Sequence, residues 1–306
     1  MKDLMMLYGV TLGRRYSRGE KVRFVEAVAI FFTELGYSIR VQSKQDAFSS
    51  TNNLIIGDIK KAKRVFLVAY DTPATITIPN YRYFPFNPKR NLRNESIDVL
   101  INFAIASLSF IIMFFLLKDF GQYELWKKIV TVLVGILLTW MAYDRLRKKG
   151  NRINFNRNSA SIALLCELAK SYKGKNVAFV MLDQTVNSYL GLKLLREEMT
   201  GDGKVFILLD CLAKGEELVI VCKGNVNSEL IVNNGEDLKI YQKDFDEFQN
   251  QENILGFFPN MLYMASGSNE EKQFVVRNTR SKKDYDVDMD RLETIHRILL
   301  TYLKGE

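Results

Sequence analysis

Apolar and polar residues follow two different spacings along the chain. Between residues 19 and 35 the apolar positions recur every three or four residues, which predicts a helix that ends at Gly36. Shorter alternating or continuous apolar runs predict strands. The predicted strands are residues 38–42, 53–59, 65–69, 177–182, 204–210 and 217–222, and further helices are predicted at 159–170, 189–197 and 289–304.

Most of these strands are apolar throughout, and they alternate with helices. This pattern predicts an α/β fold with a mainly parallel or mixed central sheet and helices on both faces. Sheets of this kind place their functional sites at the carboxyl ends of the strands. We therefore expect a site formed by residues 69–71, residues 183–186 and Asp210.

Two long uncharged runs interrupt this pattern. The first covers nineteen residues, 99–117, and the second covers fifteen, 129–143, which Leu125 and Trp126 extend. About 20 apolar residues are needed to cross the hydrocarbon core of a bilayer. A buried helical hairpin in a soluble core is the alternative, but core helices normally keep a polar stripe and the first run has none. We predict a transmembrane hairpin with helices at about 99–117 and 126–143.

The charges around the hairpin predict its orientation. The two outer flanks, 81–98 and 144–157, carry ten basic residues against three acidic ones, whereas the connecting loop 118–128 carries three lysines against two acids. Because positive charge stays on the cytoplasmic side, both termini and the main domain are predicted to be cytoplasmic, in a two-pass protein of the cell membrane. Anionic lipid is the expected partner of the basic flanks. Nearly all of the formal net charge of +8 lies there, so a nucleic-acid partner is not expected.

The remaining sequence indicates one domain divided by the insertion. The predicted divisions are 1–80 and 158–306 for the two parts of the domain, and 81–157 for the membrane insertion. The N-terminal apolar run is too short for a signal peptide. The three cysteines, Cys166, Cys211 and Cys222, are widely spaced in apolar runs and fit buried thiols better than a disulfide framework or a zinc ribbon. The aromatic segment 81–88 is interpreted as an interfacial anchor, with a partner-binding loop as the alternative.

Five short motifs stand in order at or near the predicted strand ends. They are V-A-Y-D-T-P at 68–73, N-R-N-S-A-S-I-A-L-L-C-E-L-A at 156–169, F-V-M-L-D-Q-T-V-N-S-Y-L-G at 179–191, L-L-D at 208–210 and R-N-T at 277–279. Together they resemble the motifs of the di-zinc aminopeptidase family that includes bacterial aminopeptidases, glutamate carboxypeptidase and the transferrin receptor. The resemblance covers most of the chain outside the hairpin and implies the fold of that family.

The same resemblance implies that the metal centre is degenerate. The family binds two zinc ions with two histidines and three carboxylates, and a glutamate acts as general base. At the corresponding positions this chain has Ala69 and Asn278 for the histidines, Arg157 for the bridging aspartate, Thr185 for the general base and Val186 for a glutamate ligand, while Asp210 and the supporting Asp71 are retained. A single histidine, His296 in a predicted helix, cannot supply a two-histidine centre. No metal or other cofactor and no catalytic residue is therefore expected.

Other groups of polar residues have simpler interpretations. The acids of D-Y-D-V-D-M-D, 284–290, lack the glycine of a calcium loop and favour the N-terminus of the closing helix. Asp71 and Asp210 could form a catalytic pair, but an ion pair with Arg157 is the preferred interpretation. Ser159 and Ser161 stand at a predicted helix start, where serine commonly caps the helix.

Two classes of function remain. The preferred hypothesis is a membrane-tethered, cytoplasmic-facing pseudopeptidase that acts as a binding, scaffold or regulatory subunit, with a protein partner whose identity the sequence does not give. A peptide or small-molecule sensor that uses the old substrate cleft is a variant of this hypothesis. The alternative is an active metal-dependent aminopeptidase-like hydrolase with an unorthodox site, or one that uses Asp71 and Asp210.

Overall fold

The computed structural model describes seven stretches of the chain and divides it into two compact units. We call them the sheet unit and the hairpin unit, and each is described by itself. The sheet unit consists of Met1–Pro73, Asn80–Pro88 and Gly150–Glu306, and the hairpin unit consists of Ala74–Pro79 and Lys89–Lys149. The described residues are 1–46, 50–186, 188–199, 203–235, 237–245, 254–271 and 273–305.

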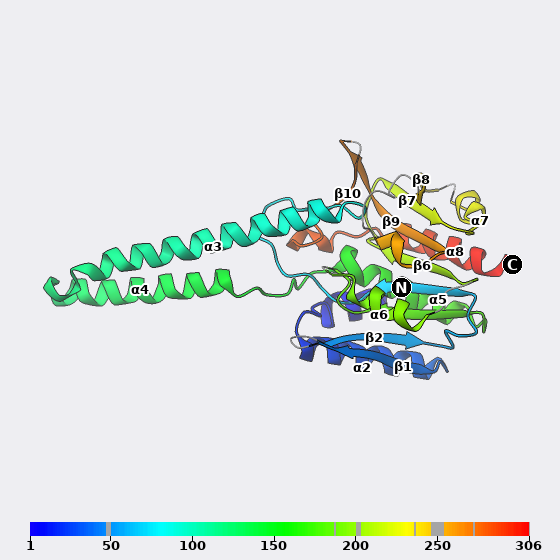
Figure 1. Cartoon of the computed structure of the whole chain (residues 1–306), viewed down its shortest axis with the longest axis horizontal. Helices are drawn as coiled ribbons and strands as arrows, with labels where there is room; N and C mark the ends of the chain where they lie inside the picture. Colours follow the sequence, from blue (N-terminus) through cyan, green and yellow to red (C-terminus); the bar gives the residue numbers. More distant parts are fainter. Residues whose placement is uncertain are drawn as a thin grey trace. The chain divides into compact units, whose positions relative to one another are not determined.

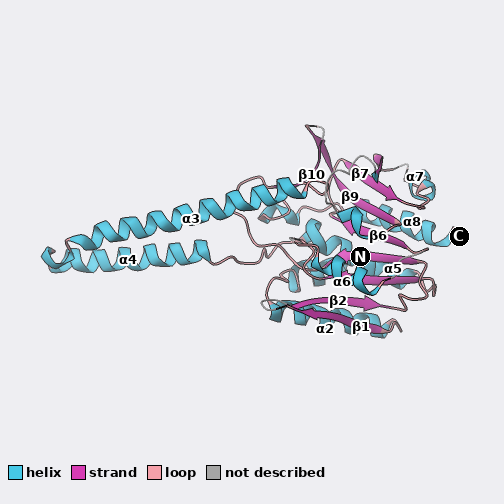
Figure 2. Ribbon diagram, in the orientation of Figure 1, coloured by secondary structure: helices cyan, strands magenta, loops and turns pink. Residues whose placement is uncertain are grey.

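A mixed sheet forms the centre of the sheet unit (Figures 1 and 2). Within the described residues its main path runs β1-β2-β5-β3-β6-β9-β10-β4, and β7 and β8 continue from β9. Strands β5, β3, β6 and β9 are parallel neighbours, whereas β1, β2, β7, β10 and β4 each have an antiparallel neighbour. The strands are β1 Ile39–Gln45, β2 Ser50–Ile56, β3 Arg64–Ala69, β4 Arg82–Tyr83, β5 Val177–Leu182, β6 Val205–Asp210, β7 Glu217–Lys223, β8 Ile240–Asp244, β9 Met261–Glu270 and β10 Gln273–Arg277.

Helices and short turns cover both faces of this sheet. Alternate strand residues such as Phe66, Phe179 and Ile207 belong to one buried apolar cluster with side chains of α2, α5 and α8. On the other face Phe206 stacks on Phe258, with ring centroids 3.8 Å apart. The helices are α1 Lys2–Met5, α2 Arg18–Glu34, α5 Ala160–Ser171, α6 Leu190–Glu198, α7 Glu229–Asn233 and α8 Met289–Lys304, with π-helical turns η1 Met6–Thr11 and η3 Phe155–Ser159 and 3₁₀ turns η5 Ile254–Phe257 and η6 Lys282–Tyr285.

The hairpin unit contains two long helices joined by a short 3₁₀ turn. Helix α3 spans Pro88–Lys118, η2 spans Phe120–Gln122 and α4 spans Leu125–Leu146. Both helices are long and apolar enough to cross a membrane. In each helix only 11% of the most apolar window is buried, whereas the core helix of a soluble protein is mostly buried. Among their most exposed apolar side chains are Leu100 at 67%, Phe114 at 67% and Leu133 at 61%.

The structure corrects the interpretation of the aromatic segment 81–88. This segment is not an interfacial anchor, because Tyr81, Phe84 and Phe86 are buried in the sheet unit. The ring of Phe86 packs against Tyr263 of β9 at a centroid distance of 5.2 Å. Strand β4 pairs with β10 within this segment. Its aromatic residues therefore build the core beside the strand ends.

The capping interpretation of the two serines is also wrong. Ser159 is the N-cap residue of α5, but its side chain makes no capping hydrogen bond. The Ser159 hydroxyl donates to the Tyr8 carbonyl at 2.8 Å instead. The buried hydroxyl of Ser161 has no hydrogen-bond partner among the described residues. Residues 150–157 also lie in the sheet unit, although the sequence placed them in the insertion.

Candidate functional site

A buried ion pair lies where β6 ends. Arg157, in the π-helical turn η3, pairs through its guanidinium with the carboxylate of Asp210, the last residue of β6. The two side chains are only 5% and 8% exposed. Removing two charges from water is costly unless they pair closely and their remaining hydrogen-bonding atoms are satisfied. The expected ion pair therefore forms with Asp210.

Aromatic and thiol groups enclose this pair. The hydroxyls of Tyr83 and Tyr263 donate to Asp210 at 3.1 and 3.0 Å, and the Cys211 thiol donates to it at 3.2 Å. The Arg157 guanidinium also lies over the Tyr83 ring, 4.3 Å from its centroid. The carboxylate thus has a full set of donors. We call these five residues the Arg157 cluster.

The protonation behaviour of the Arg157 cluster follows from burial and from the ion pair. Burial alone would lower the pKa of Arg157, but the charge of Asp210 reverses this effect and raises the pKa above its usual value. Burial raises the pKa of Tyr83 and of Cys211, and the charge of Asp210 adds to both shifts. At neutral pH the phenol and the thiol remain protonated. Neither is activated as a base or a nucleophile.

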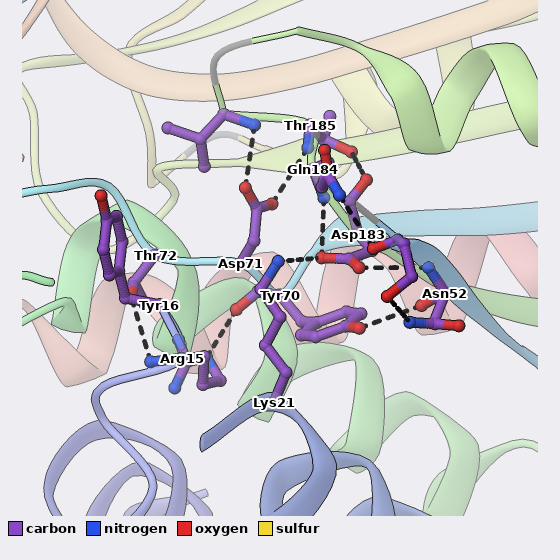
Figure 3. Close-up of polar contacts among 12 residues, drawn as sticks. Arg15, Tyr16, Lys21, Asn52, Tyr70, Asp71, Thr72, Asp183, Gln184 and Thr185 are labelled. Carbon is purple, nitrogen blue, oxygen red and sulfur yellow. Dashed lines mark hydrogen bonds and ion pairs between the residues drawn. The ribbon is translucent and has the colours of Figure 1, made fainter. Parts of the chain in front are cut away.

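Asp71 lies just beyond the end of β3 and is not part of the Arg157 cluster. Its carboxylate accepts the backbone N–H groups of Thr185 and Val186, at 3.1 and 3.4 Å, and so fixes the loop after β5 (Figure 3). Burial raises the pKa of Asp71, with Lys21 opposing the shift. The side-chain amide of Asn158 donates to the Asp71 carbonyl. Asp71 therefore organises a loop and takes no part in the Arg157 ion pair.

A second ion pair, which is partly buried, joins α2 to the end of β5 beside that loop. Lys21 lies 2.6 Å from the fully buried Asp183, whose carboxylate also accepts the N–H groups of Asn52 and Gln184, at 3.1 and 2.8 Å (Figure 3). Nearby, the fully buried Arg15 donates to the carbonyls of Tyr70, Tyr8 and Leu12 and to the hydroxyl of Ser159. Each buried charge here has partners within the domain.

A cavity of about 740 Å³ opens beside the Arg157 cluster. Asn278, in a left-handed conformation (φ 64°), lines it, and its N–H donates to the Tyr81 carbonyl at 2.9 Å. Buried Asp284 also lines it, and one of its carboxylate oxygens accepts the N–H of Arg157 at 3.3 Å. Burial raises the pKa of Asp284 well above the usual 3.8. The other lining residues are Asn156, Lys214, Gly215, Glu216, Gly267, Ser268, Asn269, Glu270, Val275, Arg277, Lys283, Asp286, Val287 and Asp288.

The side chains at the positions that the resemblance aligns with zinc ligands do not fit a di-zinc centre. Ala69 and Val186 offer no donor atom, and the guanidinium of Arg157 is the partner of Asp210. A fixed cation there opposes the binding of two divalent ions. Among the described residues no three His, Cys, Asp or Glu side chains are placed to hold a metal ion. His296 lies on α8 beside Glu167 of α5.

The structure places the seven predicted positions in two groups and two single positions. Arg157 and Asp210 form the ion pair, and Asp71, Thr185 and Val186 form the fixed loop. Asn278 lines the cavity, and Ala69 ends β3. Sequence reasoning missed Tyr83 because its segment was interpreted as an anchor, and it missed Tyr263 because no strand was predicted at 261–270. Asp284 gave no signal beyond its place in an acidic stretch.

The fold of the sheet unit is that of zinc aminopeptidase-like proteins, as three solved structures show. Glutaminyl cyclase from Macrostomum lignano shares 11% identity over 99% of this chain and 88% of that chain, at a TM-score of 0.51. The Fimbriiglobus ruber glutaminyl cyclase shares 13% over 100% and 92%, at 0.51. The Legionella pneumophila LapA aminopeptidase shares 8% over 98% and 68%, at 0.52. No protein-family model and no curated protein matches the sequence.

Proposed function

We propose that the chain is a membrane-anchored pseudopeptidase, a protein that binds a ligand through a peptidase-like domain without cleaving it. The observation that carries this proposal is the Arg157–Asp210 ion pair. It fills the bridging-metal position with a cation and commits the retained carboxylate to that cation. Catalysis by a metal-bound water needs both the metal and a base, and Thr185 is no base near neutral pH.

The cavity beside the Arg157 cluster is the proposed binding site. Its volume of about 740 Å³ lies within the range of small-molecule and peptide sites. Asn156 and Asp284, which flank the backbone of Arg157, form part of its wall. A protein partner is proposed to insert a segment there, and the domain would then act as a scaffold or regulatory subunit.

The hairpin unit is proposed to anchor the protein in the cell membrane. Helices α3 and α4 supply the two spans, and the basic residues at their outer ends, such as Arg93 and Lys148, would contact anionic lipid. Both termini and the sheet unit would then be cytoplasmic. Cysteine at Gln122, in the connecting turn, should react with a membrane-impermeant thiol reagent in whole cells, and cysteine at the exposed Lys148 should not. The reverse labelling would refute this topology.

Activity measurements on the full chain, purified in detergent, test the central proposal. We expect substoichiometric zinc by mass spectrometry and no hydrolysis of aminoacyl chromogenic substrates with zinc, cobalt or manganese added. Chelator-sensitive hydrolysis that Asp210→Ala abolishes would instead support the active-hydrolase alternative. Because Asp210→Ala also breaks the ion pair, its folding must be verified by circular dichroism.

Binding is tested by blocking the cavity. Ser268 is half-buried on β9 and lines the cavity, so Ser268→Trp should fill part of it. Proteins that co-purify with the wild type should be lost from Ser268→Trp but kept by Ser43→Trp, an exposed position on β1 at the other end of the sheet. Equal recovery of the same partner from both variants would exclude the cavity as its binding site.

A further inference from the structure

A second, smaller pocket lies between the end of α6, the turn η5 and the end of β7. Its volume is about 330 Å³, near the lower limit for small-molecule sites. Two basic side chains, Arg196 from α6 and Lys223 from β7, stand among apolar groups. The remaining lining residues are Met199, Gly256, Phe257, Phe258 and Pro259. Among the described residues that line it, none is acidic.

Among the residues that the structure describes, no acidic side chain pairs with Arg196 or Lys223. Lys223 is half-buried, and its ammonium group donates to the Leu255 carbonyl at 3.3 Å, a neutral acceptor. The two acids that follow Arg196 are already paired, Glu197 with Lys44 and Glu198 with Arg40. Burial lowers the pKa of Lys223, and Arg196 lowers it further. Arg196 is exposed, whereas Lys223 is partly desolvated, and a second cation beside it makes its charge less favourable.

This pocket is separate from the Arg157 cluster. Lys223 pairs in register with Met261, the first residue of β9, and Met261 pairs with Phe206 near the start of β6. The pocket therefore lies at the amino ends of the parallel strands. Asp210 stands at the opposite, carboxyl edge of the same sheet.

We propose that the Arg196–Lys223 pocket binds a phosphate monoester. A phosphate carries close to two negative charges at neutral pH, which matches two cations. The arginine fork can bond two phosphate oxygens, and the lysine adds a point charge. The wall of Phe257 and Met199 would contact the organic part of the ester. The phosphate can belong to a soluble molecule or to a lipid head group, because the recognition chemistry is the same.

Calorimetric titration of the detergent-purified full chain tests this proposal. At constant ionic strength we expect phenyl phosphate to bind more tightly than inorganic phosphate, and acetate to bind more weakly than either. Arg196→Met and Lys223→Met should each weaken phenyl phosphate binding about tenfold or more, the equivalent of one charged hydrogen bond. Lys193→Met, an exposed position on the same helix, is the matched control and should bind normally. Lys223→Arg should retain most of the affinity.

Two further arms complete the test. If a lipid head group is the source, phenyl phosphate should bind the wild type more weakly in nanodiscs with phosphatidic acid than in phosphatidylcholine nanodiscs, and Lys223→Met should abolish that difference. If the source is soluble, the two affinities should be equal. Equal affinity of the wild type, Arg196→Met and Lys223→Met for phenyl phosphate would overturn the proposal. So would the absence of binding at millimolar concentrations to a wild type that unfolds cooperatively.

Discussion

The two edges of the central sheet differ in how their charged side chains are paired. At the carboxyl edge, Arg157 is matched by Asp210 and Lys21 by Asp183. At the amino edge, Arg196 and Lys223 share a pocket without a carboxylate among its described lining residues. In a peptidase-like fold the carboxyl edge is where a site is expected. At that edge Arg157 and Lys21 are paired with carboxylates, whereas at the other edge the structure describes no acidic partner for Arg196 or Lys223.

The largest loss of stability should come from breaking the Arg157–Asp210 ion pair. Arg157→Ala leaves Asp210 buried without its cation, which should reduce the free energy of unfolding by about 3–5 kcal/mol. Chemical denaturation of the full chain in detergent measures this loss. The exposed Lys304→Ala should show none, and the double variant Arg157→Met/Asp210→Leu should lose less than Arg157→Ala. An unchanged stability of Arg157→Ala would mean that the pair is unimportant.

Removal of the loop anchor should have the next largest effect. Asp71→Ala deprives the N–H groups of Thr185 and Val186 of their acceptor, at a cost of about 1–3 kcal/mol for an unsatisfied buried group. Asp71→Asn keeps one acceptor and should lose less. Hydrogen exchange of the two amides is the direct measurement, and it should accelerate in Asp71→Ala. Unchanged protection would show that other contacts hold the loop.

Replacing Asp284 should change the stability by less, and the change should depend on pH. Because burial raises its folded-state pKa above the usual 3.8, its ionisation opposes folding. Its contribution is most favourable below about pH 4 and is lost as pH rises toward the folded pKa. Asp284→Asn should therefore gain stability relative to the wild type between pH 4 and 7, as measured by thermal unfolding at each pH. A stability difference between Asp284→Asn and the wild type that stays constant from pH 4 to 7 would contradict the raised pKa of Asp284.

The smallest change in stability is expected from replacing Lys223 at the amino edge. Replacing Lys223 by methionine removes a partly desolvated charge from beside Arg196. In the absence of ligand, Lys223→Met should keep or slightly raise the melting temperature. Its free energy of unfolding should differ from that of the wild type by no more than about 0.5 kcal/mol. A clear loss of stability would show that the charge has a structural role. The contrast with Arg157→Ala would then disappear.

The sequence predicts the parallel core of the fold well and its irregular parts poorly. Residues 177–182 and 289–304 coincide with β5 and α8, because long apolar or periodic runs give a strong signal. Strands β9 and β10 and the π-helical turn η3 were not predicted. Pairing with distant strands stabilises β9, and local propensity does not reveal such contacts.

The candidate site was predictable only where a motif marked it. Arg157 and Asp210 were found because they occupy positions of the motifs that resemble the family, and the ion pair follows from burying the π-helical turn η3 beside the end of β6. Tyr83 and Tyr263 complete the cluster from segments remote in sequence. Their hydroxyls could not be assigned without the fold. The pairing of Arg196 with Lys223 in one pocket likewise depends on tertiary structure.

The route of the chain between the two units has a consequence for protein engineering. The chain leaves the sheet unit after Pro73, returns for Asn80–Pro88, and then leaves again for the long hairpin. The returning segment carries β4 and Tyr83, which covers Arg157. A truncated, detergent-free version made by deleting everything between Pro73 and Gly150 would lose that cover. A workable version has to keep residues 80–88 and remove only 89–149.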